Sequence, residues 1–125
     1  MKLEEKIKKE LFLNGIKSFN NHLFYDAHEY WEDLWSDYRL KDALFIQGLI
    51  QLSVGYFHIT NLNINGARGL LNKCLLKFES FRPYTRGIDV NYIVSCVEKS
   101  LNELDKIEHI KDFKWKLVPE IKIND

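Results

Sequence analysis

The sequence predicts an all-α fold in one domain that spans residues 1–125. Apolar residues recur every three to four positions along most of the chain, which is the period of an α-helix. A chain of this length forms one domain and can bury a sizeable core. Its residues are 46% hydrophobic and 14% aromatic, which disfavours disorder. We expect a bundle of about five helices, with neighbours roughly antiparallel because the connections are short.

Two helices are expected in the first 40 residues. The first covers residues 3–20, with apolar side chains at helical spacing and two asparagines at its end. The second begins at Asp26, because an acidic residue favours a helix N-terminus. Its apolar stripe runs from Phe24 to Tyr38 and should face the core.

The third helix is expected over residues 41–62 and should be the buried centre of the bundle. Residues 43–59 carry no Asp, Glu, Lys or Arg and are apolar on nearly all sides, which is typical of a central helix. The polar exceptions Gln47, Gln51 and His58 fall within about 40° of one another around the helix axis. A polar stripe on a buried helix needs polar partners, since an unpaired buried group costs on the order of 1–3 kcal/mol.

The second half of the chain predicts two more helices and a tail. We expect a helix from residue 64 or 65 to residue 81, and another over 90–109. The segment 83–89 between them carries a proline and a glycine and is predicted to be a loop, without a β-hairpin. The tail, 111–125, contains Phe, Trp, Leu and Val side chains and should pack either as an extended strap or as an edge strand.

Composition narrows the classes of function. Lys plus Arg and Asp plus Glu both total 18, a balance that argues against a nucleic-acid or membrane-surface binder. No stretch reads as a secretory signal or a membrane span, so we expect a cytoplasmic protein. Cys74 and Cys96 lack metal-ligand spacing and should be reduced, buried thiols, although two facing helices could join them in a disulfide.

The most distinctive cluster joins the second and third helices. His28 and Glu32 lie one turn apart at the edge of the second helix's stripe. Helices that pack about 8–10 Å apart allow side chains of this length to meet. We therefore expect His28 to lie within hydrogen-bonding or shared-ligand distance of Gln47, Gln51 or His58, beside a cavity that admits water.

The same cluster suggests metal chemistry. A His and a carboxylate four residues apart on a helix are spaced like two metal ligands, and His58 would be a third. Two imidazoles and a carboxylate suit Zn, Fe or Mn, whose bound water would be a nucleophile near neutral pH. The metal ligands would be His28, Glu32 and His58, the catalytic residues His28 and Glu32, and the binding residues Gln47, Gln51, Trp35 and Arg68. The alternative is a satisfied His–Glu–Gln network that only fixes helix packing.

Four motifs of the chain also resemble those of a known family. The first is Phe24-Tyr25-Asp26-Ala27-His28-Glu29, followed by Glu32 and Trp35, and the second is Phe45-Ile46-Gln47-Gly48-Leu49-Ile50-Gln51 with His58 downstream. The third and fourth are Gly66-Ala67-Arg68-Gly69-Leu70-Leu71 and Tyr84-Thr85-Arg86-Gly87-Ile88-Asp89. Together they resemble the domain of unknown function 309 family over about residues 12–97. His22 stands where that family usually has a turn glycine, and Asp26 replaces a glutamate.

This resemblance implies a compact five-helix bundle and adds weight to the His/Glu/Gln cluster as a site. The family is catalogued as predicted metal-dependent hydrolases, which implies a divalent metal but no particular substrate. Two functions stay open. One is a hydrolase-like enzyme, and the other is a non-catalytic, tetratricopeptide-like helical module that binds a small molecule or peptide, or forms a homodimer.

Overall fold

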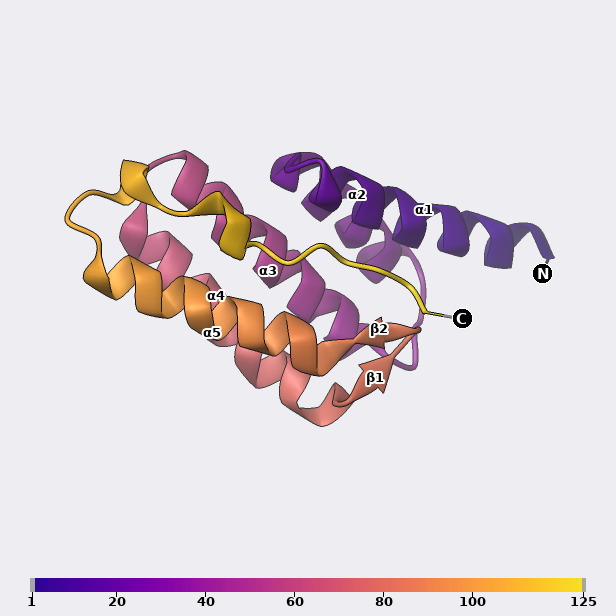
Figure 1. The fold of residues 1–125 in the computed structure, drawn as a ribbon. Helices are drawn as coiled ribbons and strands as arrows, with labels where there is room; N and C mark the ends of the chain where they lie inside the picture. Colours follow the sequence, from indigo (N-terminus) through magenta and orange to yellow (C-terminus); the bar gives the residue numbers. More distant parts are fainter. Residues whose placement is uncertain (1, 125) are drawn as a thin grey trace.

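The computed structural model describes residues 2–124 and confirms the all-α fold (Figure 1). Over these residues the helices are α1 (Lys2–Asn20), α2 (Phe24–Asp37), α3 (Ala43–Thr60), α4 (Ile64–Phe78) and α5 (Val90–Lys106). A small hairpin consists of β1 (Tyr84–Thr85) and β2 (Ile88–Asp89). Three 3-10 turns complete the described chain, namely η1 (Glu79–Phe81), η2 (Ile110–Asp112) and η3 (Trp115–Leu117).

α3 lies at the centre of the bundle and packs against both α2 and α4. Nine of its residues are buried, among them Leu49 and Tyr56. The central position agrees with the prediction, but the expected burial on nearly all sides is wrong. The line of Gln47, Gln51 and His58 is half-exposed, because α2 and α4 flank this side of α3 without covering it. The polar stripe therefore faces outward.

By length and composition alone, α3 could also cross a membrane. Ala43–Thr60 has a mean hydropathy of 1.3, and it is the one helix of residues 2–124 that passes such a test. Half of this stretch is buried inside the bundle, as expected for the core helix of a folded domain.

α1 packs closely on α2 at a glycine. The indole of Trp31 occupies the space that a Cβ on Gly15 would need. Its Nε1 donates a hydrogen bond to the carbonyl oxygen of Phe12 at 3.2 Å, and its ring centroid lies 6.1 Å from that of Phe19. Trp31 is fully buried, so this part of the α2 stripe faces the core as the spacing predicts.

The turn between α1 and α2 contains a residue in the left-handed region. His22 has φ +59°, a conformation that glycine adopts without steric cost. This conformation fits the turn glycine that the family resemblance implies for this position. The ring of His22 stacks on Phe24 at 5.2 Å and lies 5.9 Å from Trp115, so contacts with the core and the tail hold it in place.

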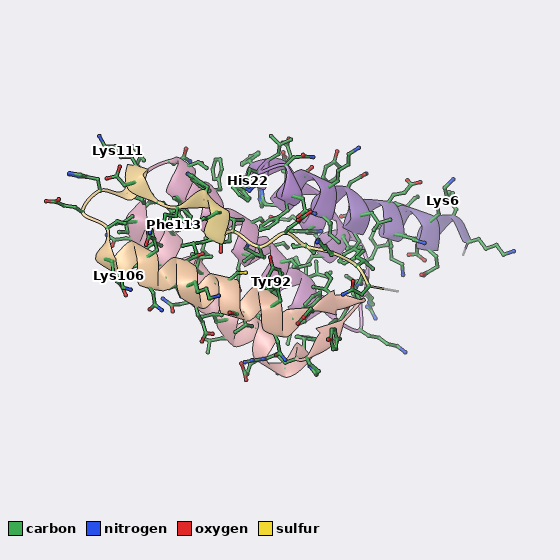
Figure 2. All side chains as sticks on the ribbon, viewed as in Figure 1. Lys6, His22, Tyr92, Lys106, Lys111 and Phe113 are labelled. Carbon is green, nitrogen blue, oxygen red and sulfur yellow. The ribbon has the colours of Figure 1, made fainter. Side chains whose placement is uncertain are left out.

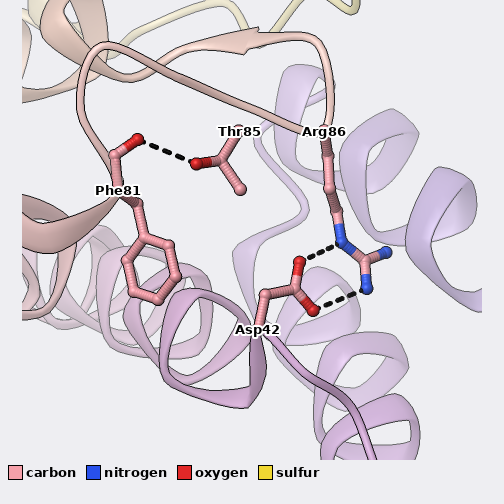
Figure 3. Close-up of polar contacts among 4 residues, drawn as sticks. All are labelled: Asp42, Phe81, Thr85 and Arg86. Carbon is pink, nitrogen blue, oxygen red and sulfur yellow. Dashed lines mark hydrogen bonds and ion pairs between the residues drawn. The ribbon is translucent and has the colours of Figure 1, made fainter.

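The segment predicted to be a loop contains the β-hairpin, so that prediction was wrong. Thr85 pairs with Ile88 across an antiparallel ladder. The two turn residues, Arg86 and Gly87, have φ +53° and +74°, as a type I′ turn requires. The Asn-Gly or Asp-Gly pair that usually marks a type I′ turn in a sequence is absent, since Arg86 precedes Gly87. A bidentate ion pair with Asp42, just before α3, holds Arg86 in this conformation (Figure 3). Nη2 of Arg86 lies 3.0 Å from Oδ1 of Asp42.

The tail is an extended strap, the first of the two predicted alternatives. It runs from the end of α5 across α3 and back toward the hairpin (Figure 1). Phe113, labelled in Figure 2, is buried beneath this strap with its ring 6.4 Å from Tyr56. The side-chain amide of Asn20 bonds both the N–H and the C=O of Ile121, at 2.8 and 2.9 Å. The last residue of α1 therefore anchors the tail.

Replacing Asn20 with alanine is expected to loosen this strap. The change leaves the N–H and C=O of buried Ile121 without their partner, which should lower the free energy of unfolding by about 1–3 kcal/mol for each group. Hydrogen–deuterium exchange should become faster in residues 118–123 and stay unchanged in α3. Asn21→Ala removes only an exposed bond to the Lys17 carbonyl and serves as the control. Equal effects of the two changes would contradict the anchoring role.

Candidate functional site

Three residues of the predicted cluster, His28, Glu32 and Gln47, lie on the outer surface between α2 and α3. Tyr25 and Phe57 mark one end of this seam, with ring centroids 5.4 Å apart. At the other end is a hollow of about 130 Å³, lined by Glu32, Trp35, Gln47 and Ile50. The seam is lined by residues that are spaced alternately three and four positions apart along each helix. We call this surface the outer strip: Tyr25, His28, Glu32 and Trp35 of α2, and Gln47, Ile50, Val54 and Phe57 of α3.

His28 and Glu32 lie in contact in the middle of the outer strip. Nε2 of His28 lies 3.1 Å from Oε2 of Glu32, and Nδ1 lies 2.9 Å from the carbonyl oxygen of Tyr25. A carbonyl oxygen can only accept, so Nδ1 carries a hydrogen and donates it. Nε2 donates to the carboxylate when the ring is charged, and presents a lone pair beside it when the ring is neutral. The Tyr25 carbonyl thus fixes the orientation of the ring.

The two glutamines of α3 differ in their surroundings. Gln47 lines the hollow together with Glu32, so these two predicted site residues do meet. Oε1 of Gln51 is buried and accepts no hydrogen bond from residues 2–124. Within the same residues, His28 bonds to its own helix and not to a glutamine of α3, contrary to our expectation. Gln51 thus keeps a buried acceptor without a donor among the described residues.

Two predicted site residues lie away from the outer strip. His58 is at the end of α3, where its Nδ1 accepts a hydrogen bond from Nδ2 of Asn63 at 3.4 Å. Arg68 lies on the side of α4 that faces α5, with Nη2 2.9 Å from Oδ1 of Asp105 and 3.3 Å from the Leu104 carbonyl. His58 thus supports the turn between α3 and α4, and Arg68 joins α4 to α5.

The donors present do not fit a catalytic metal centre with three protein ligands. Across residues 2–124, no group of three His, Cys, Asp or Glu side chains is close enough to hold a metal ion. His28 and Glu32 could supply two ligand atoms. His58, the expected third ligand, contributes instead to the α3–α4 turn. Catalytic zinc sites use three protein ligands and an open position, so the outer strip is one ligand short.

Neither cysteine supplies a nucleophile. Both thiols are free, so the disulfide left open by the sequence is not formed. Burial raises the pKa of the Cys74 thiol far above its usual range, and burial also raises the pKa of Cys96. A thiol with a raised pKa carries little of the reactive thiolate. Both cysteines are therefore structural.

Larger hollows lie elsewhere, and the largest of them carries Glu108 and His109, two described residues between which no ion pair or hydrogen bond is formed. One of about 490 Å³ is beside η2 and the α3–α4 turn, and one of about 300 Å³ is between β2, α5 and the tail. The carboxylates of the second are already engaged, because Asp89 caps α5 at the Tyr92 N–H and Glu120 pairs with Lys122. The outer strip remains the better candidate site.

The outer strip has two features that the apolar spacing did not predict. Tyr25 and Trp35 are 51% and 40% exposed, although the spacing places Trp35 in the core stripe of α2. In addition, α2 holds five acidic residues and no Lys or Arg, whereas α4 holds three basic residues and no acidic one. The formal net charge of the whole chain is zero, so it does not reveal this difference in charge between α2 and α4. The difference is the sequence signal that could have drawn attention to this face.

Comparison with known proteins identifies the family. Residues 12–70 match the family model described as Domain of unknown function (DUF309), which confirms the resemblance for the first two motifs. The match ends within the third motif, and the fourth lies beyond it. The matched residues include all of α2 and α3 and hence the whole outer strip. No curated protein in the comparison matches the chain. Over residues 12–70, the chain matches the domain of unknown function 309 family.

Proposed function

We propose that the protein is a non-catalytic binding module that docks a helix of a protein partner on the outer strip. The observation that carries this proposal is the apolar edge around the His28–Glu32 pair, formed by the exposed rings of Tyr25 and Trp35 with half-buried Ile50 beside them. Large aromatic side chains around a polar pair are typical of protein interfaces. The docked helix presents an apolar side chain to the hollow and a basic residue to Glu32.

The dimensions of the hollow support a protein partner over a small-molecule substrate. Its volume is about 130 Å³. Pockets that enclose drug-sized ligands measure roughly 300–1,000 Å³. A cavity of about 150 Å³ holds a single benzene-sized group, so this hollow admits one apolar side chain. Recognition of a helix in a groove depends on such single anchors, spaced along one face of the bound helix.

We do not extend the proposal to metal-dependent hydrolysis, the other function predicted from the sequence. His28 and Glu32 would be two ligands, and residues 2–124 bring no third acidic, His or Cys side chain to them. Hydrolysis at this place would need a further ligand from a bound substrate or another chain. The cytoplasmic location also stays a prediction.

A synthetic amphipathic helix tests the proposal. The probe is a labelled peptide of about four turns with a leucine anchor flanked by lysines, and the matched peptide carries glutamates in place of the lysines. Fluorescence anisotropy should show binding of the lysine peptide, with an affinity ~10-fold or more above that of the glutamate peptide. Glu32→Lys should reverse this preference.

An exposed charge outside the strip provides the matched variant. Glu98 lies on α5 and is exposed, so Glu98→Lys changes the net charge equally without touching the strip. It should leave the preference for the lysine peptide intact. If neither peptide binds, or if Glu98→Lys acts as strongly as Glu32→Lys, the outer strip is not the docking surface.

A further inference from the structure

One side of α4 runs along the exposed side of α3, across from α2. A Cβ on Gly66 would lie 2.9 Å from the ring of His58, and a Cβ on Gly48 would lie 3.1 Å from the Cβ of Lys77. The two contacts fix both ends of this side of α4 against α3. Residues spaced four, three and four positions apart share one side of a helix, and we call this side the basic border: Gly66, Leu70, Lys73 and Lys77.

The basic border faces the same way as the outer strip. His58, which contacts Gly66, belongs to the half-exposed polar line of α3. On the other side of α4, Arg68 pairs with Asp105 of α5. Gly66 and Arg68 point about 200° apart around the helix axis, so the basic border is turned away from α5 and toward the exposed line of α3. The outer strip, the polar line and the basic border therefore form one continuous face.

Charge changes sign across this face. Lys73 and Lys77 form its basic edge, and no ion pair within residues 2–124 involves either of them. α3, in the middle, contains no Asp, Glu, Lys or Arg. Glu32 lies at the other edge, exposed and in contact with His28 of its own helix. The face thus has an acidic edge on α2 and a basic edge on α4, with an uncharged centre between them.

The charged edges lie level with the hollow. Glu32 and Gln47 both line the hollow. Lys77 lies against Gly48, the next residue of α3. Glu32 and Lys77 are therefore at similar heights on the two sides of α3. Lys73 lies about 6 Å further along α4, at 1.5 Å per residue. An apolar side chain in the hollow would have a carboxylate on one side and two ammonium groups on the other.

A helix docked on the outer strip has a second flank, which lies over α3. Packed helices lie about 8–10 Å apart, a separation that long charged side chains can bridge. We infer that the partner helix carries acidic residues on this second flank, where Lys73 and Lys77 bind them, and basic residues on the flank that faces Glu32. The partner is an amphipathic helix with its charges segregated by sign on the two sides of its apolar anchor. This inference rests on the proposed function, whose partner it specifies.

Helices with one sign of charge on both flanks fit this face less well. A helix that is basic on both flanks brings its second flank against Lys73 and Lys77, and one that is acidic on both meets the five acidic residues of α2. Like charges brought together oppose association. A charge-segregated helix satisfies both edges in only one direction, because turning it end for end exchanges its flanks. The charge pattern therefore also sets the direction of the partner.

The direction follows from the handedness of the helices. On the near side of a right-handed helix that runs upward, successive residues advance to the right. Gln47 lines the hollow beside α2 and the next residue, Gly48, contacts α4, so α2 lies to the left of α3 and α4 to the right. The anchor of a docked helix is on its far side, where residues advance to the left. A partner parallel to α3 therefore has its basic residues one and four positions after the anchor, and its acidic residues three and six positions after it.

Two peptides of identical composition test the inference. Both have about four turns and one central leucine. The forward peptide carries the lysines and glutamates of the parallel pattern, and the exchanged peptide has every lysine and glutamate interchanged. In fluorescence anisotropy, each should bind roughly 10-fold more tightly than the lysine peptide, because glutamates now meet the basic border.

The direction of each peptide is measured with a nitroxide label at its N-terminus. The label on the forward peptide should broaden amide NMR signals near Leu44, at the start of α3. The label on the exchanged peptide should broaden signals near His58, at the end of α3. Broadening at the same end for both peptides, or equally at both ends, would show that the two edges do not select opposite charges and would overturn the inference.

A double charge reversal tests the basic border itself. Lys73→Glu with Lys77→Glu should weaken binding of the forward peptide by roughly 10-fold or more and strengthen binding of the lysine peptide. Lys99→Glu with Lys106→Glu changes the net charge equally at two exposed positions of α5, and it should alter neither affinity. If circular dichroism shows that the α4 variant has lost its helices, Lys73→Glu alone, at an exposed position, gives the same test. Unchanged binding of the forward peptide to a folded α4 variant would contradict the role of the lysines.

The two proposals fail in different ways. If the forward and exchanged peptides bind no more tightly than the lysine peptide, the acidic flank of the partner is overturned and the docking strip stands. If none of the peptides binds, the inference and the proposed function are overturned together.

Discussion

Replacing Trp31 with alanine is expected to lower the free energy of unfolding by about 3–5 kcal/mol. The indole is fully buried, fills the space beside Gly15 and donates to the carbonyl of Phe12. The substitution therefore leaves a large cavity between α1 and α2 and removes the additional hydrogen bond to the Phe12 carbonyl. Urea denaturation followed by circular dichroism should show a lower midpoint with a similar slope.

Trp35 is the matched control for this change. It lies one helical turn from Trp31 on α2 but is 40% exposed and lines the hollow of the outer strip. Trp35→Ala should lower the free energy of unfolding by about 1 kcal/mol or less, since little buried area is lost. The same variant should weaken binding of the lysine peptide. Equal losses of stability for the two tryptophans would show that Trp35 belongs to the core and not to a docking surface.

Ending the chain after His109 is expected to unfold the protein or to leave it marginally stable. The deletion removes Phe113, Val118 and Ile121, which are all buried. Full burial of one such side chain contributes about 1.5–3 kcal/mol, and the total stability of a small domain is about 5–15 kcal/mol. The loss of the strap also uncovers Tyr56 at the centre of the bundle. Thermal unfolding followed by circular dichroism measures the effect.

A deletion at the other end of the chain provides the comparison. Residues 2–7 of α1 are exposed, and Lys6 points into solvent in Figure 2. Removing residues 1–6 should change the free energy of unfolding by less than about 1 kcal/mol. If this deletion costs as much as the loss of the tail, the strap is not the main stabilising segment.

The helices could be predicted from the sequence because their apolar spacing is local and repeated. Their ends could not be placed as well. The last helix was predicted to reach residue 109 but ends at Lys106, where the N–H of Ile107 bonds to the Glu103 carbonyl. Such end geometry depends on a few hydrogen bonds that the apolar pattern does not report. The hairpin was missed for a related reason, since an ion pair to Asp42 supports Arg86 in its turn conformation.

The candidate site could be predicted only where its contacts are local. The His28–Glu32 pair follows from a spacing of four residues on one helix, and the short connection to α3 brings Gln47 to the same seam. The position of Arg68 depends instead on α5, 36 residues further along the chain, and that of His58 on a contact with Asn63 in the adjacent turn, which apolar spacing does not report. Apolar spacing showed a stripe on α2, but not that Trp35 would lie at its solvent edge.

The most direct test of the docking face compares amide NMR spectra of the chain with and without the lysine peptide. The account predicts shifts on the outer strip, at Tyr25, Glu32 and Trp35, and none around Glu98 on α5. The residues that shift report the interface without any substitution. Spectra that do not change when the peptide is added, or shifts confined to α1, α5 or the tail, would contradict the account.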